Sequence, residues 1–195
     1  RVLSQITDTE SLLQEAVETV RSRFDFYYVQ IYLVDEVSNM LTLQAGTGNV
    51  GRELVRMGHR LVVAAGSINA MAAVEKRAII VSDTATSPMF RPNAYLPRTR
   101  SEMAVPLLIG NRVVGVLDLQ SADPGSLSAE NLPAFEAMAG QLAVAIENAK
   151  LLSEAAEARA EVESFTRRIT RDGWNSYLDA VVHPRFMGFS YDSNT

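Results

Sequence analysis

The residue types that most often carry chemistry are scarce in this sequence. It has no cysteine and two histidines, His59 and His183. The missing thiols exclude disulfides, thiolate catalysis and cysteine-ligated zinc. No triad-like pattern, glycine-rich phosphate loop or metal-ligand spacing accompanies the histidines. We therefore predict no catalytic residue and no metal site. Haem is not expected either, because a lone histidine is more often a surface residue than an axial ligand.

The stretch from Thr84 to Arg100 is the other place where function could reside. Its three prolines prevent a regular helix or a central strand. Long irregular segments inside compact domains commonly close a site. Arg98 and Arg100 could offer guanidinium forks to a carboxylate or another anion, although loop arginines are often simply solvated. Asp83, just before this segment, is predicted to cap the next turn.

Composition limits the possible partners. The chain of 195 residues has 23 acidic and 18 basic side chains, a net charge of −5, and arginines that form no stripe. Nucleic acid is therefore not an expected partner. No apolar run approaches the roughly 18 residues that span a bilayer, and no secretory signal is visible. We expect a cytoplasmic fragment without membrane contact.

Hydrophobic periodicity predicts an α+β domain on an antiparallel sheet. Thr7 and Glu10 have the spacing of a capping box, and Ser67 can cap a second, short helix. The connection from Gly46 to Gly58 has no clear pattern. The predicted elements, in chain order, are a helix from Thr7 to Phe24, a hairpin over Val29–Ala45, a strand at Leu61–Val63, a helix after Ser67, a strand at Ile79–Val81 and a hairpin over Ser101–Ser121.

A long helix is predicted from Ser128 to about Thr170. Apolar residues in it recur at spacings of three and four, as in a coiled coil. Because the helix outlasts the domain beneath it, we expect the far part to pair with a second copy. Periodicity breaks at 170–174, and residues 185–195 are expected to begin a following region. The candidate dimer interface consists of Phe135, Met138, Leu142, Ala145, Ala149, Leu152 and Ala156.

Several segments together resemble a GAF domain over about residues 7–150. They are Ser101–Leu107 (SEMAVPL), Gly110–Leu119 (GNRVVGVLDL) and Gln141–Ala149 (QLAVAIENA), preceded in the same order by Gly66-Ser67-Ile68 and Ile79–Asp83. The resemblance implies a GAF-like, PAS-like fold. In such a fold the terminal helices pack on one face of the sheet, and a short helix and a long loop cover a pocket on the other.

The resemblance and strand parity together suggest which residues form the pocket. Its walls would come from strand and helix residues, with two aromatic residues as a lid and two arginines beside them. The alternative is that the strand positions are simply core. The candidates are Ile31, Leu33, Met71, Phe90, Tyr95, Arg98, Arg100, Met103, Val105, Leu117 and Leu119.

The resemblance also narrows the ligand without naming it. Bilin attachment and methionine sulfoxide reduction in relatives need cysteines, and the lysine-containing signature of cyclic-nucleotide-binding relatives is missing. We expect a sensory domain, cut from a larger bacterial signalling protein, that binds an unidentified small molecule and signals through dimerising helices to an effector in the same chain. The alternative is a ligand-free dimerisation spacer. The expected organisation is a linker or helix start (1–6), the GAF-like domain (7–150), a signalling or coiled-coil helix (151–170) and a linker with the start of the next region (171–195).

Overall fold

A computed structural model describes residues 2–64 and 66–182 of the chain. The chain divides into two compact units, with the boundary between Leu151 and Leu152. The first unit is built on a six-stranded antiparallel sheet with strand order β3-β2-β1-β6-β5-β4. The strands are β1 (Tyr28–Asp35), β2 (Met40–Gly46), β3 (Arg60–Val62), β4 (Ile79–Val81), β5 (Ser101–Ile109) and β6 (Arg112–Ser121).

The hairpin predicted over Ser101–Ser121 is confirmed as β5 and β6, and two of its glycines have a backbone role. Gly110 takes a left-handed φ of 59° between the strands. A Cβ on Gly115 would lie 2.3 Å from the backbone oxygen of Tyr32, so only glycine allows β6 to approach β1 this closely. Pairing of β5 with β4 ends at Ala104, so Pro106 lies where β5 has no strand on its outer side.

Four helices accompany the sheet in the described residues, and three of them differ from the sequence-based expectation. The first helix includes Thr7 instead of beginning there, and residues 48–56 form a helix that no pattern had indicated. That helix is held by contacts with other elements: its Gly48 N–H donates to Glu18 Oε1 (2.9 Å), and Gly51 packs against the Gly46 backbone. The helices are α1 (Val2–Phe24), α2 (Gly48–Arg56), α3 (Ile68–Glu75) and α4 (Leu132–Val182).

Helix α4 also differs from the prediction. It continues through 170–174, where a break was expected. A single glycine such as Gly173 costs a helix only about 1 kcal/mol relative to alanine, which does not suffice to end it. None of the described helices, α4 included, combines the length and apolar character needed to cross a membrane. The region expected to begin a following domain, 185–195, lies outside the described residues, as does His183.

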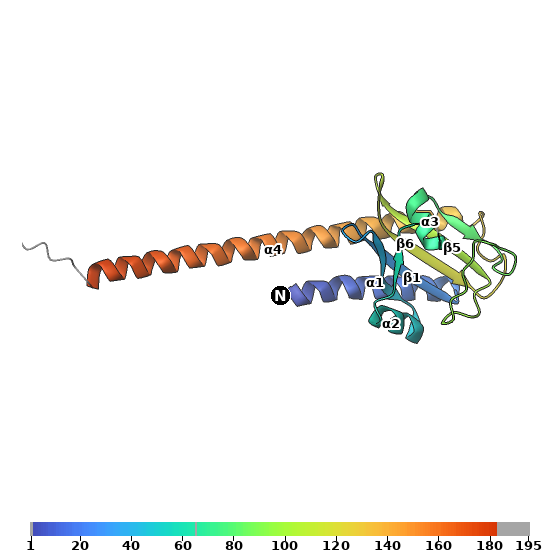
Figure 1. Cartoon of the computed structure of the whole chain (residues 1–195), viewed down its shortest axis with the longest axis horizontal. Helices are drawn as coiled ribbons and strands as arrows, with labels where there is room; N and C mark the ends of the chain where they lie inside the picture. The colour runs from blue at the N-terminus through green and yellow to red at the C-terminus, as the bar shows by residue number, and fades with distance from the viewer. Residues whose placement is uncertain (1, 65, 183–195) are drawn as a thin grey trace, which may run out of the picture. The chain divides into compact units, whose positions relative to one another are not determined.

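The two faces of the sheet carry separate cores. One core joins strand residues such as Val29 and Leu117 to Leu13 and Val17 of α1 and Phe135 of α4. The other joins the opposite side of the same strands to α2, α3 and Leu96, and α3 lies against β5 and β6 (Figure 1). The predicted fold class is therefore confirmed, with terminal helices on one face and a short helix and loop on the other.

Candidate functional site

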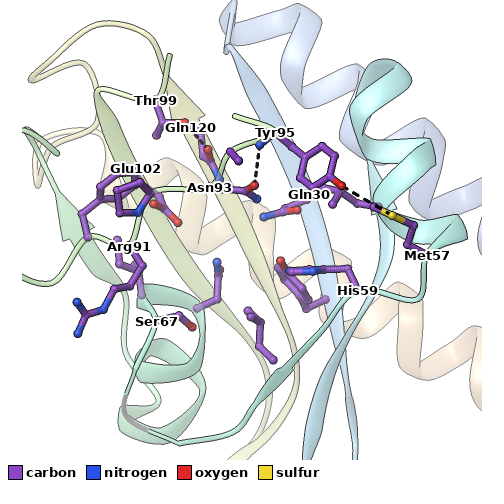
Figure 2. A pocket seen from close by; sticks show the side chains of 18 residues that line it. Gln30, Met57, His59, Ser67, Arg91, Asn93, Tyr95, Thr99, Glu102 and Gln120 are labelled. Carbon is purple, nitrogen blue, oxygen red and sulfur yellow. Dashed lines mark hydrogen bonds between the residues drawn. The ribbon is translucent and has the colours of Figure 1, made fainter. Parts of the chain in front are cut away.

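A cavity of about 520 Å³ lies on the α3 side of the sheet (Figure 2). This volume is within the range of small-molecule sites, roughly 300–1,000 Å³. Apolar side chains contribute to its wall, among them Tyr32, Leu54, Ile68 and Phe90. Polar residues lining it are Gln30, His59, Ser67, Asn69, Arg91, Asn93, Thr99, Glu102 and Gln120.

The floor of the cavity is polar because of the way three strands alternate. Gln30 of β1, Glu102 of β5 and Gln120 of β6 are each 3–6% exposed, and each lies beside an apolar residue that faces the other core. Pairing across the sheet brings them together, since Gln30 is opposite Asp118 and Glu102 is opposite Gln120. The strands thus gather four polar side chains in a largely apolar sheet.

Asp118 is the centre of a buried hydrogen-bond network. Its Oδ2 accepts from Gln30 Nε2 at 2.6 Å and from Gln120 Nε2 at 2.8 Å. Gln120 Oε1 in turn accepts from the Thr99 hydroxyl at 2.7 Å, which ties the loop to the floor. Asn69 and Glu102 lie close enough to lower the pKa of Asp118 by hydrogen bonding, although Asp118 Oδ1 has no well-formed hydrogen bond among the described residues.

Burial dominates the ionisation of this network. Desolvation raises the pKa of Glu102 far above its usual range, and the neighbouring Asp118 charge raises it further. Desolvation also raises the pKa of Asp118, against the hydrogen bonds from Gln120 and Gln30. Two adjacent buried carboxyls cannot both ionise easily, and the stronger rise in the pKa of Glu102 favours its protonated form, with the negative charge at Asp118. At the rim, desolvation lowers the pKa of His59, which favours its neutral form.

Two buried acceptors at the cavity remain unused. Gln30 Oε1 and Asn69 Oδ1 have no hydrogen-bond partner in the described part of the chain, and both residues line the cavity. Leaving a buried acceptor unpaired costs about 1–3 kcal/mol. The arrangement is therefore suited to a guest that can donate hydrogen bonds.

The segment between β4 and β5 forms the outer wall of the cavity. Thr84 N donates to Arg100 O (2.9 Å) and Arg100 N donates to Ser121 O (2.7 Å), so backbone bonds hold its two ends. Inside it, Asn93 Oδ1 accepts from Tyr95 N (2.9 Å), and the Tyr95 hydroxyl lies 4.0 Å from Met57 Sδ (Figure 2). The part of the segment around Asn93 and Tyr95 is thus held by few and weak contacts.

The predicted lid residues Phe90 and Tyr95 do line the cavity. Six predicted wall residues do not, and this placement is corrected here: Ile31, Leu33, Met103, Val105, Leu117 and Leu119 belong to the core beneath α1 and α4. A strand alternates faces at every residue, so a parity assignment that is off by one moves the whole set to the wrong side.

The other predicted pocket residues have partners elsewhere. Met71 packs half-buried in the second core without lining the cavity. The Arg98 guanidinium lies 4.6 Å from the centre of the Tyr27 ring, and Arg100 pairs with Asp83 Oδ1 at 3.1 Å. Asp83 also accepts from Ala85 N (3.0 Å), as its predicted capping role requires. Neither arginine is among the residues that line the cavity.

The polar floor was not predicted, although the sequence contains a signal for it. Asp118 and Gln120 alternate with leucines in a strand that is otherwise apolar, and Glu102 begins another. A charged or amide side chain inside a strand covered on both faces must be buried, and buried polar groups mark function more often than apolar ones do. Within the described ranges, no group of three or more His, Cys, Asp or Glu is placed to hold a metal ion.

The predicted dimer stripe divides into two parts. Phe135 is 2% exposed in the domain's own core, so it is not available to a partner. Met138 and Leu142 pack against that core, and Ala145 and Ala149 are half-buried. In the second unit, Ala156 is half-buried and Leu152 is 69% exposed.

Comparison with known proteins agrees with this geometry. A family model described as GAF domain matches residues 6–147. No protein of the curated set matches the chain. Among solved structures, the GAF domain of a phosphoenolpyruvate-protein phosphotransferase from Acinetobacter has a TM-score of 0.64 at 21% identity, covering 79% of this chain and 93% of its own.

Two other similar structures come from proteins with different activities. A type II free methionine-R-sulfoxide reductase from Thermoplasma acidophilum has a TM-score of 0.61 at 18% identity, covering 74% of this chain and 96% of its own. Residues 122 to 287 of a methyl-accepting chemotaxis protein have a TM-score of 0.62 at 18% identity, covering 78% and 98%. At such identities the likeness shows the fold alone.

Proposed function

Because the chain belongs to the GAF domain family, whose members are sensory and regulatory domains of signalling proteins, we propose that it binds a small molecule in the cavity above Gln30, Glu102 and Gln120. The observation that carries this proposal is the polar floor. Burying the side chains of Gln30, Asn69, Glu102, Asp118 and Gln120 with two acceptors unused lowers stability unless something else satisfies those acceptors. A bound ligand would supply that compensation.

Occupancy would reach the terminal helices through the strands themselves. Gln30, Glu102 and Gln120 face the cavity, while their neighbours Ile31, Met103 and Leu119 lie in the core against α1 and α4. A ligand that orders the 84–100 loop and shifts these strands would therefore change how the helices pack. A coupling of about 1–3 kcal/mol is typical of such linkage and is sufficient to bias an effector in the same protein.

We further propose that α4 pairs with α4 of a second copy. In its second unit, Val162, Phe165 and Ile169 are 52–64% exposed at spacings of three and four. Apolar residues at this spacing are typical of a coiled-coil seam, and water exposure of such a stripe is unfavourable. The same stripe would serve a ligand-free dimerisation spacer, which is the alternative function.

A regulatory role is proposed in preference to a catalytic one. The fold is shared with sulfoxide reductases, so the fold by itself does not decide. This chain has no cysteine. The polar groups at the cavity floor are held by one another, as Gln30 and Gln120 are by Asp118, and no nucleophile with an adjacent base is found among the described lining residues.

The test is thermal unfolding with a panel of amino acids, nucleotides, short carboxylates, amines and inorganic anions. A ligand that binds only the folded state raises the midpoint. Ala94 lines the cavity, so Ala94→Trp should abolish the shift, whereas Ala85→Trp, at an exposed position of the same loop that does not line it, should retain the shift. A panel without any response would favour the spacer.

Dimerisation is tested separately by sedimentation equilibrium. Phe165→Glu places a charge in the proposed seam and should give monomers. Ser164→Glu adds the same charge at the preceding position, outside the 162-165-169 series, and should leave dimers intact. A monomeric wild-type chain would refute the pairing proposal without affecting the ligand proposal.

A further inference from the structure

We propose that the cavity selects a small organic cation, an ammonium or guanidinium group that donates hydrogen bonds to Gln30 Oε1 and Asn69 Oδ1 beside the Glu102 carboxyl group. This inference rests on the proposed ligand-binding function and names the chemical class of the ligand. Three features of the cavity support it: two amide oxygens without partners, a buried negative charge at the floor, and nearby cationic side chains that are not placed to neutralise that charge.

The amide of Gln30 can be oriented in only one way. Its Nε2 donates to Asp118 Oδ2 at 2.6 Å, and an ionised carboxylate only accepts, so Oε1 must be the free end. Asn69 Oδ1 is likewise buried without a hydrogen-bond partner in the described part of the chain. Both free ends are carbonyl oxygens, which bind N–H or O–H donors and repel anions.

The charge at the floor is also uncompensated. Asp118 is fully buried and Glu102 is 6% exposed, and no ion pair involving either is found in residues 2–64 and 66–182. A buried carboxylate without a cation is costly, and a cationic guest would offset that cost. Protonation of Glu102 reduces the charge of the pair to about −1 without removing it.

The protein's own cations near the cavity are not placed to neutralise this charge. Arg98 lies over Tyr27 and Arg100 pairs with Asp83. Arg91 lines the cavity but is exposed, and its guanidinium points away from Gln30 and Gln120 (Figure 2). Desolvation lowers the pKa of His59 and so favours its neutral form. The positive charge that suits the floor must therefore enter with the ligand.

The experiment compares probes that are matched in size and differ in charge. Putrescine and agmatine should raise the unfolding midpoint of the whole chain, whereas 1,4-butanediol, which has the length of putrescine without its charge, and succinate should not. Asp118→Asn keeps the shape of the side chain, removes the negative charge of the pair, and should weaken putrescine binding in calorimetry about tenfold or more, because the cation then enters a buried floor without a charge to pair with. The matched control Glu130→Gln changes an exposed residue and should bind as wild type.

The outcomes of these measurements distinguish failure of the cation assignment from failure of the proposed ligand-binding function. Equal shifts with butanediol and putrescine, or unchanged putrescine binding in Asp118→Asn, would overturn the cation assignment. A shift produced only by anions or neutral metabolites, and abolished by Ala94→Trp, would overturn it while leaving the proposed function intact. No shift with any probe or panel compound would remove both. The midpoint of each variant without ligand shows whether that variant is folded.

Discussion

The two faces of the sheet are built from the same strands and differ in almost every other respect. Under α1 and α4, Val29, Ile31, Leu117 and Leu119 are fully buried among apolar neighbours. One residue away along the same strands, the α3 face buries Gln30, Glu102, Asp118 and Gln120. Neighbouring positions of one strand can therefore serve stability on one side and recognition on the other, so each face should respond differently to mutation.

The largest effect is expected from Leu117→Ala, on the apolar face. Deleting a fully buried leucine leaves a cavity and typically costs 2–5 kcal/mol. Urea unfolding should show this loss in the free energy of unfolding. Because Leu117 faces α4 and not the ligand cavity, the ligand-induced shift of the remaining folded protein should persist. Lost ligand response with unchanged stability would mean that Leu117 belongs to the binding site after all.

Leu117, which was predicted to line the pocket, also illustrates which features of the fold could be predicted from the sequence and which could not. Periodicity and turn residues correctly located the hairpin from Ser101 to Ser121 and the Ser67 cap, because these are local properties. Which residues of a strand face the cavity depends on which side of the sheet α1 and α4 cover. Long-range packing decides that arrangement, so local sequence does not reveal it. Helix α2 was not predicted because it also depends on long-range packing: contacts from α1 and the Gly46 backbone hold it in place.

The next largest effect is expected on the polar face, where a substitution should raise the free energy of unfolding instead of lowering it. Glu102→Gln should stabilise the protein by on the order of 1 kcal/mol near neutral pH. The folded state raises the pKa of Glu102, so it binds more protons than the unfolded chain, and stability falls as pH rises from the unfolded pKa through the folded one. A glutamine does not titrate, so the variant avoids the loss of stability that wild type undergoes at Glu102 as pH rises.

The measurement is the midpoint difference between Glu102→Gln and wild type across pH. It should be near zero at about pH 4, where both states hold the proton, and grow as pH rises. Asp118 faces Glu102, and its pKa is also raised, so the variant should retain some dependence in the same direction. A variant that is less stable than wild type at neutral pH would show that the Glu102 charge is compensated in the fold.

A smaller loss is expected from Ser67→Ala, at the start of the helix that covers the polar face. Ser67 Oγ accepts from Ala70 N at 3.1 Å and caps α3, and removing such a cap costs about 1 kcal/mol. Ser67→Asp supplies an equally good cap and should restore the free energy of unfolding. If alanine and aspartate give the same stability as serine, the cap does not hold α3 over the cavity.

The smallest effect should come from Arg100→Gln, at the edge of the same face. Arg100 is about half exposed, and its pair with Asp83 is one of the surface ion pairs that contribute little to stability. A double-mutant cycle with Asp83→Asn in urea should therefore find a coupling close to the error of the method, weaker still at high salt. The backbone bonds of Arg100 to Thr84 and Ser121 do not depend on its side chain, so the loop and the ligand response should survive. If Arg100→Gln instead abolished the ligand-induced shift at unchanged stability, the arginine would be a ligand contact, and the polar face would extend beyond the buried floor to its rim.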